Sequence, residues 1–188
     1  IPFLSNVCKI HQMPTYRNLV ADKLFGYKEK HIARYCTQQV NVSSFDLILC
    51  ASYYYFPLQA AYRLAKRFNL PLVVDLRDIA EQWGSLDYYT RRLTGIKFID
   101  NIAKSLYTRT NMRQRNRVLR YAQAVTTVSV WHREKLSSYN ENTRLIYNGY
   151  DPKEDEAGEL FNKKIPKFDD IKLFNLSSTT VMSGANSF

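Results

Sequence analysis

Short apolar runs alternate with amphipathic segments through the middle of the chain. Five runs have the length of buried strands: Phe45–Ala51, Leu72–Leu76, Ala124–Ser129, Arg144–Tyr147 and Ile171–Leu176. Between the first two, residues 58–68 place their apolar side chains at helical spacing. The runs show little polar alternation, which is typical of parallel strands covered by helices on both faces. The pattern therefore predicts an α/β fold.

Helices are expected in the intervals between the strands. A long helical stretch spans roughly Tyr88–Tyr121, and a short one spans Trp131–Tyr139 with Ser129 as its N-cap. Asn69-Leu70-Pro71 ends the helix that follows the first strand. Because parallel neighbours need a crossover connection, this order predicts a Rossmann-like, doubly wound parallel sheet. The first 44 residues indicate only loop and a short helix.

Polar side chains gather where the second strand ends. In such sheets ligands bind beyond the carboxyl ends of the strands, and Asp75, Arg77 and Asp78 lie there. An arginine can bind a phosphate or carboxylate with two hydrogen bonds, and an aspartate can orient a sugar hydroxyl or act as a base. The alternative is a structural Arg–Asp pair. Trp83 follows shortly after, and could stack on a substrate ring or fill the edge of the core.

Composition adds a net charge of +10, from 27 Lys and Arg against 17 Asp and Glu. This excess indicates an anionic partner. Nine cations and one acid lie between Tyr88 and Tyr121, so this basic belt carries most of the charge. A helix on an anionic bilayer, a nucleic-acid surface and an ordinary solvated helix all fit it. Its closely spaced arginines are Arg109, Arg113, Arg115, Arg117 and Arg120.

Several other kinds of site have no motif in the chain. Cys8, Cys36 and Cys50 lack CxxC spacing, which favours reduced core cysteines over zinc ligands or a disulfide framework. The histidines show no metal-ligand spacing, so no metal site is expected, and His132 is expected at the surface of a helix N-terminus. The chain shows no glycine-rich phosphate loop and no apolar run of about 20 residues, and a signal peptide is not expected.

Three segments, in order, resemble the N-terminal domain of family 4 glycosyltransferases, which have the GT-B fold. Phe45–Ser52, a helix and Leu70–Asp78 resemble the family's "FDLI…PLVVDLRD.W" unit. Arg120–Ser129 is similar to its "ADAVTTVS" strand, and Leu145–Asp151 is similar to its "IPNGVD" strand end. Together these segments cover about residues 45–152.

The resemblance implies a retaining transferase. Such an enzyme moves a sugar from a nucleotide-sugar donor to a cell-surface polysaccharide or lipid-linked acceptor, without a cofactor or an essential metal. Arg77 and Asp78 match the strand-end motif that faces the cleft, and are the catalytic candidates. The basic belt matches a region that touches anionic membranes, which implies a cytoplasmic protein peripheral on the inner face of the plasma membrane. The acceptor-binding candidates are Asp75, Trp83 and Ser129, and the residues that match the domain junction are Asn148, Gly149 and Asp151.

The resemblance also predicts a division of the chain. Residues 1–152 are expected to form the acceptor-side domain without its opening strand and glycine-rich loop, 153–170 a linker, and 171–188 a stub of a C-terminal donor domain. Such a fragment is expected not to catalyse transfer alone, because half a cleft cannot bind the donor and stabilise developing charge. Two alternatives are a basic nucleic-acid-binding α/β module and a flavodoxin-like interaction module whose acidic strand end binds a metal or is phosphorylated.

Overall fold

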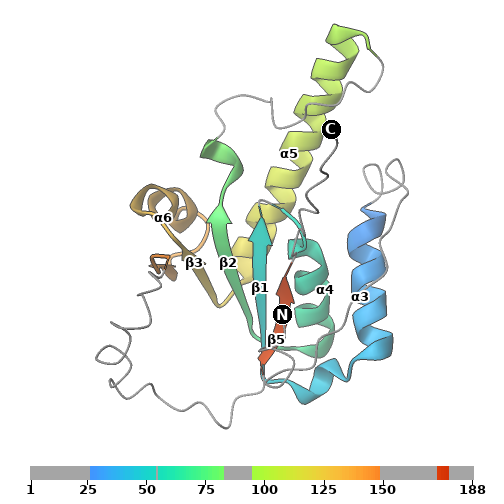
Figure 1. Ribbon diagram of the computed structural model, residues 1–188, viewed down its shortest axis with the longest axis vertical. Helices are drawn as coiled ribbons and strands as arrows, with labels where there is room; N and C mark the ends of the chain where they lie inside the picture. The colour runs from blue at the N-terminus through green and yellow to red at the C-terminus, as the bar shows by residue number, and fades with distance from the viewer. Residues whose placement is uncertain (1–25, 54, 83–94, 149–172, 178–188) are drawn as a thin grey trace, which may run out of the picture.

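The computed structural model describes residues 26–53, 55–82, 95–148 and 173–177. In this part of the chain, helices pack against a sheet of five strands (Figure 1). The elements in chain order are α3 (Tyr27–Gln39), the 3-10 turn η1 (Val42–Ser44), β1 (Leu47–Tyr53), α4 (Leu58–Phe68), β2 (Leu72–Asp78), the 3-10 turn η2 (Ala80–Gln82), α5 (Lys97–Tyr121), β3 (Ala124–Thr127), α6 (Val130–Ser137), β4 (Thr143–Leu145) and β5 (Leu173–Ser177).

The sheet is parallel throughout, with the strand order β4-β3-β2-β1-β5. Ile48 lies opposite Leu72 between β1 and β2, and Val74 lies opposite Val125 between β2 and β3. Each step from β1 to β4 passes through one helix, as parallel neighbours require. The predicted α/β fold with a Rossmann-like parallel sheet is confirmed.

The described helices pack on one face of this sheet. Along β2 the buried residues Leu72, Val74 and Leu76 alternate with the half-buried Val73 and Asp75. Successive right-handed crossovers in one direction place α4, α5 and α6 on the same side. Their buried residues join those of the strands in a single core. In the described part of the chain, helices therefore cover one face of the sheet, and the expected helices on the other face are absent. The second face keeps half-buried apolar side chains, among them Leu47, Leu49, Val73 and Ala124.

Most predicted elements are present with shifted ends. Helix α4 matches its predicted range, and Asn69 ends it in the left-handed conformation at φ 52°. β3 ends at Thr127 because Ser129 already caps α6. The long predicted helix is described from Lys97, and its first predicted residues lie outside the described ranges. Helix α3 is longer than expected, since only Ile32 and Cys36 of its 13 residues are buried and the pattern is weak.

Strand β5 lies elsewhere than the sequence predicts. The resemblance assigns residues 171–188 to a stub of a second domain. In the structure β5 pairs with β1, from Leu173 opposite Leu47 to Ser177 opposite Ala51. The ring of Phe174 contacts the ring of Phe45 at 5.3 Å. These five residues therefore form an edge strand of the same sheet, and Phe174 and Leu176 pack against its core. The predicted linker at 153–170 lies outside the described residues.

Candidate functional site

The carboxyl ends of the strands meet along one edge of the sheet, and the first half of α5 extends past that edge (Figure 1). Side chains there come from β2, from η2, from the start of α6 and from the segment after β4. The sequence candidates found at this edge are Asp75, Arg77, Asp78, Ser129 and Asn148. The candidates Trp83, Gly149 and Asp151 lie outside the described residues.

Asp75 ties β2 to β3. One of its carboxylate oxygens accepts a hydrogen bond from the hydroxyl of Thr126 at 2.7 Å, and the other accepts one from Nε of Arg77 at 3.2 Å. Asp75 and Arg77 point to the same face of the sheet, as strand alternation predicts. The Asp75 side chain is 20% exposed. Because both oxygens are engaged, Asp75 is suited to positioning Arg77 rather than to contacting a ligand.

Arg77 connects two distant parts of the chain at the sheet edge. Its Nη1 donates to the side-chain oxygen of Asn148 at 3.3 Å, across 71 residues of sequence. The Arg77 side chain is 67% exposed. A guanidinium that is oriented from two sides and still open to solvent can bind a phosphate or carboxylate.

Asp78 lies on a chain of hydrogen bonds that reaches into α6. The amide nitrogen of Gln82 donates to a carboxylate oxygen of Asp78 at 3.1 Å. The amide oxygen of Gln82 lies 3.0 Å from Nε2 of His132, which places the ring proton on Nε2, since that oxygen can only accept. Asp78 thus has a defined orientation at the site.

His132 is buried, so its predicted surface position is wrong. As the third residue of α6, it contacts Gln82 of η2 through its ring. Its Nδ1 is buried without a hydrogen-bond partner. The predicted cap is confirmed, because Oγ of Ser129 accepts a hydrogen bond from the backbone N–H of His132 at 3.1 Å. The Ser129 hydroxyl keeps its own proton to donate, so acceptor binding by this residue remains a prediction.

Arg115 is not an external anion-binding residue, in contrast to the prediction for the basic belt. It is 1% exposed. Nη1 and Nη2 donate to the two carboxylate oxygens of Glu81 at 2.6 and 2.5 Å, and Nε donates to the side-chain oxygen of Asn116 at 3.1 Å. The pattern of charges in the sequence gives no sign of this pair, because Glu81 and Arg115 are brought together only by folding. The four other closely spaced arginines of the belt, Arg109, Arg113, Arg117 and Arg120, are exposed.

The electrostatics of η2 follow from this pair. Burial works against ionisation of Glu81, but the hydrogen bonds and positive charge of Arg115 outweigh it, with a smaller contribution from His132. The pKa of Glu81 therefore lies below its usual value. An ionised, fixed Glu81 anchors the turn that carries Gln82, and so the turn that orients Asp78.

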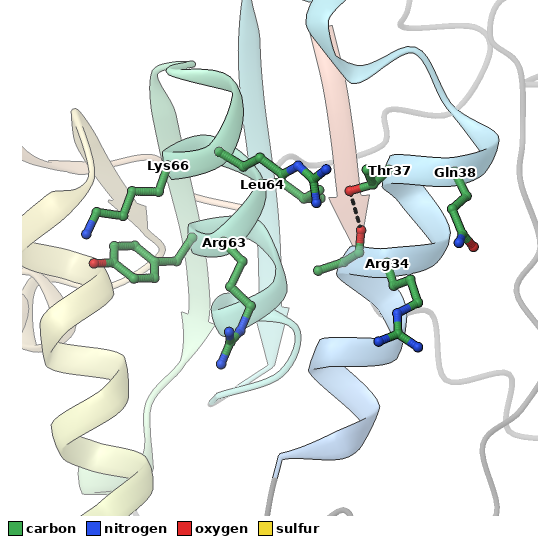
Figure 2. A pocket seen from close by; sticks show the side chains of 9 residues that line it. Arg34, Thr37, Gln38, Arg63, Leu64 and Lys66 are labelled. Carbon is green, nitrogen blue, oxygen red and sulfur yellow. Dashed lines mark hydrogen bonds between the residues drawn. The ribbon is translucent and has the colours of Figure 1, made fainter.

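A second basic region, besides the belt, lies between α3 and α4, away from the carboxyl ends of the strands. It is an open groove of about 640 Å³, with Arg34 and Gln38 contributed by α3 and Arg63 and Lys66 by α4 (Figure 2). Its concavity alone does not make it the candidate site. The groove has no carboxylate among its lining residues, whereas the strand edge combines acids, a guanidinium and ordered amides.

Among the described residues, no group of three or more His, Cys, Asp or Glu side chains could hold a metal ion. None of the described helices is long and apolar enough to cross a membrane.

Comparison with known proteins identifies the family. The family model described as Glycosyltransferase Family 4 matches residues 9–154, most of the chain. Comparisons with curated proteins and with solved structures find no match. The matched range contains β1 to β4 and every candidate residue at the sheet edge. The chain therefore belongs to glycosyltransferase family 4.

Proposed function

We propose that this chain is the acceptor-side part of a retaining glycosyltransferase. The donor is a nucleotide-sugar held mainly by a second domain, and the acceptor is a cell-surface polysaccharide or a lipid-linked glycan. In the reaction, the bond between the anomeric carbon and the donor's phosphate oxygen breaks and the nucleotide leaves with that oxygen. A bond forms from the same carbon to the acceptor oxygen with the same configuration, and the proton of the acceptor hydroxyl passes to the leaving phosphate. Family membership supports the reaction type.

One observation carries the assignment of the site. Asp75 uses both carboxylate oxygens to hold Thr126 and Arg77, while Asp78 is oriented separately by Gln82. This arrangement offers an exposed cation and an ordered carboxylate at the end of one strand. In the proposal Arg77 binds an anionic group of the substrate, Asp78 orients a sugar hydroxyl, and Asp75 positions Arg77.

The remaining residues have supporting roles in this proposal. Trp83 stacks on the acceptor and Ser129 donates a hydrogen bond to it. Asn148, Gly149 and Asp151 form the junction toward the donor-binding domain. We place the protein in the cytoplasm, peripheral on the inner face of the plasma membrane, where the exposed arginines of the basic belt meet anionic lipids.

Ligand titration by NMR tests the site. The isotope-labelled chain is titrated with a panel of nucleotide-sugars and short oligosaccharides, and we expect chemical-shift changes centred on Arg77, Asp78 and Ser129. Arg77→Ala and Asp78→Asn should weaken binding at least tenfold and leave the fold unchanged, since Arg77 is exposed and Asp78 is half-buried. Arg67→Ala, on the exposed end of α4 at the opposite edge of the sheet, is the matched control.

Two results would contradict the proposal. One is a set of shift changes that leaves the strand edge untouched for every ligand in the panel. The other is equal binding by the wild type and by both site variants.

A further inference from the structure

The open groove between α3 and α4 is lined by polar and charged side chains from both helices. α3 contributes Arg34 and Gln38, which are exposed and four residues apart, and α4 contributes Arg63 and Arg67 at the same spacing. Residues four apart lie on one side of a helix, so each wall presents a row of side chains to the groove. Figure 2 shows Arg34 and Arg63 extending the same way from the two facing helices. Guanidinium groups therefore stand on both sides of the groove.

The floor of the groove is made of small and apolar side chains. Leu64 is buried, and Ala33 and Thr37 are half-buried. The hydroxyl of Thr37 donates to the carbonyl oxygen of Ala33 at 2.8 Å, so its proton is already used. The groups that can donate to a ligand in the groove are therefore the charged side chains of the walls and the amide of Gln38.

The positive charge of the groove is not balanced by acids. In the described part of the chain, no acid lies within ion-pair distance of the four groove cations, Arg34, Arg63, Lys66 and Arg67. α4 contains no acid. The one acid of α3, Glu29, accepts a hydrogen bond from the backbone N–H of Ala60 at the start of α4. The groove is therefore a concave surface of one sign of charge.

The energetic cost of this arrangement points to a bound anion. Like charges three or four residues apart on a helix repel each other, and Arg63 has such neighbours in Lys66 and Arg67. The helix dipole favours cations in the last turn, which accounts for Lys66 and Arg67. It does not account for Arg63, or for Arg34 in the middle of α3. An anion in the groove would relieve the repulsion among all four charges.

We infer that the α3–α4 groove is a binding site for a soluble compound that carries a chain of three or more phosphate groups. A guanidinium can donate two hydrogen bonds to one phosphate, and a chain of phosphates reaches the arginines of both walls at once. The groove volume of about 640 Å³ lies within the range of small-molecule sites, roughly 300–1,000 Å³. This site goes beyond the proposed function and does not rest on it.

The lining of the groove distinguishes this ligand from other anions. No large apolar side chain of α4 is exposed, so a lipid bilayer would find no apolar partner beside these cations. The ring of Tyr62 lies edge-on against the ring of Tyr121 at 5.0 Å, and the ammonium of Lys66 lies 5.8 Å from its centre. The ring is therefore already in use and is poorly placed to stack on a nucleobase. A chain of phosphates needs neither contact.

Isothermal titration calorimetry with sodium tripolyphosphate tests the site in the full chain. The groove variant is Arg63→Gln/Arg67→Gln. The control is Arg109→Gln/Arg113→Gln, a pair of exposed arginines at the same spacing on α5, so both variants lose the same charge. A third variant, Arg34→Gln, tests the opposite wall. Glutamine is a good helix former and all five positions are exposed, so the fold should survive, which circular dichroism checks.

We expect tripolyphosphate to bind at one site at about 0.15 M salt. Because a hydrogen bond to a charged group is worth about tenfold in affinity, Arg34→Gln should weaken binding about tenfold, the groove variant at least as much, and the control less than about threefold. In NMR spectra of the labelled chain, the shift changes should centre on Gln38 and Leu64. ATP, added without a metal, separates two sources of such a chain: tighter binding than tripolyphosphate assigns the site to a nucleotide, and weaker binding to an inorganic polyphosphate.

Four results would overturn the inference: no binding of tripolyphosphate at millimolar concentration, equal losses in the groove variant and the control, unchanged affinity of Arg34→Gln, or tighter binding of single-stranded RNA or phosphatidylglycerol vesicles than of tripolyphosphate. Tripolyphosphate contains no sugar, and shift changes in the groove are recorded separately from those at Arg77 and Asp78. Failure of this inference is therefore distinguishable from failure of the proposed function.

Discussion

The guanidinium of Arg115 is buried and donates a hydrogen bond to each carboxylate oxygen of Glu81, 34 residues earlier in the chain. This pair joins the C-terminal third of α5 to the turn that follows β2. The ring of Tyr139 lies 5.7 Å from the guanidinium carbon and adds a cation–π contact from the segment after α6. The pair therefore fixes the 3-10 turn from which Gln82 orients Asp78.

Removing the buried arginine should destabilise the protein strongly. Arg115→Ala leaves Glu81 without its partner and opens a cavity, so we expect a loss of about 3–5 kcal/mol in the free energy of unfolding. The exposed neighbour in Arg117→Ala should change it by no more than about 0.5 kcal/mol. Urea unfolding measures both. Similar losses in the two variants would show that the ion pair does not anchor the turn.

The contribution of Glu81 to the free energy of unfolding should decrease as the pH falls. Because its pKa is lower in the folded protein than its ordinary value of 4.5, the ion pair stabilises the fold fully above that value. As the pH falls below 4.5, Glu81 is protonated in the unfolded chain before it is protonated in the folded protein. The stabilisation therefore declines until the pH has fallen below the pKa of Glu81 in the folded protein. The free energy of unfolding of the wild type minus that of Glu81→Gln, measured between about pH 7 and about pH 3, should therefore shrink with acid. A difference that grows with acid would contradict the cause assigned to the shift.

The two faces of β1 should differ in their response to truncation. Ile48 is fully buried against the helix layer, and Ile48→Ala should lower the free energy of unfolding by about 2–5 kcal/mol. Leu49 points to the half-buried second face, and Leu49→Ala should lower it by roughly half as much or less. Equal effects in urea unfolding would mean that the second face is covered as well as the first.

The buried cysteines should be nearly inert toward alkylation in the folded protein. Burial raises the pKa of Cys36 to about 11, and burial together with the charge of Glu29 raises that of Cys50 further. At about pH 8 both thiols stay protonated, and only a thiolate reacts quickly with iodoacetamide. Mass spectrometry should find both sites labelled only after unfolding in urea. Rapid labelling of Cys50 under native conditions would contradict its place in the core.

The sequence predicts the fold well because the fold depends on local patterns. The run from Leu72 to Leu76 is too short and too apolar for a surface helix, and residues 58–68 repeat at helical spacing, so a parallel crossover unit follows. The weakest predictions concern the element ends and β5. The partner of an edge strand is chosen by packing, in this case of Phe174 on Phe45, and no local pattern contains that choice.

The candidate site is predictable only in part, for a related reason. A parallel sheet brings its carboxyl ends together, so Asp75, Arg77 and Asp78 could be placed at an edge from sequence. Gln82 and His132 were missed as its supports, since neither stands in a motif and their contact spans 50 residues. The only local sign that His132 supports the site is its position as the third residue of a helix that Ser129 caps.

The sequence by itself determined the parallel sheet, the strand end that carries the polar residues and the excess of positive charge along α5, because each depends on residues near one another in the chain. Tertiary structure alone decided how those residues are used. It buried Arg115 against Glu81 while leaving Arg109, Arg113, Arg117 and Arg120 exposed. Charges that look equivalent in sequence acquire different roles because burial depends on which side of the helix meets the core.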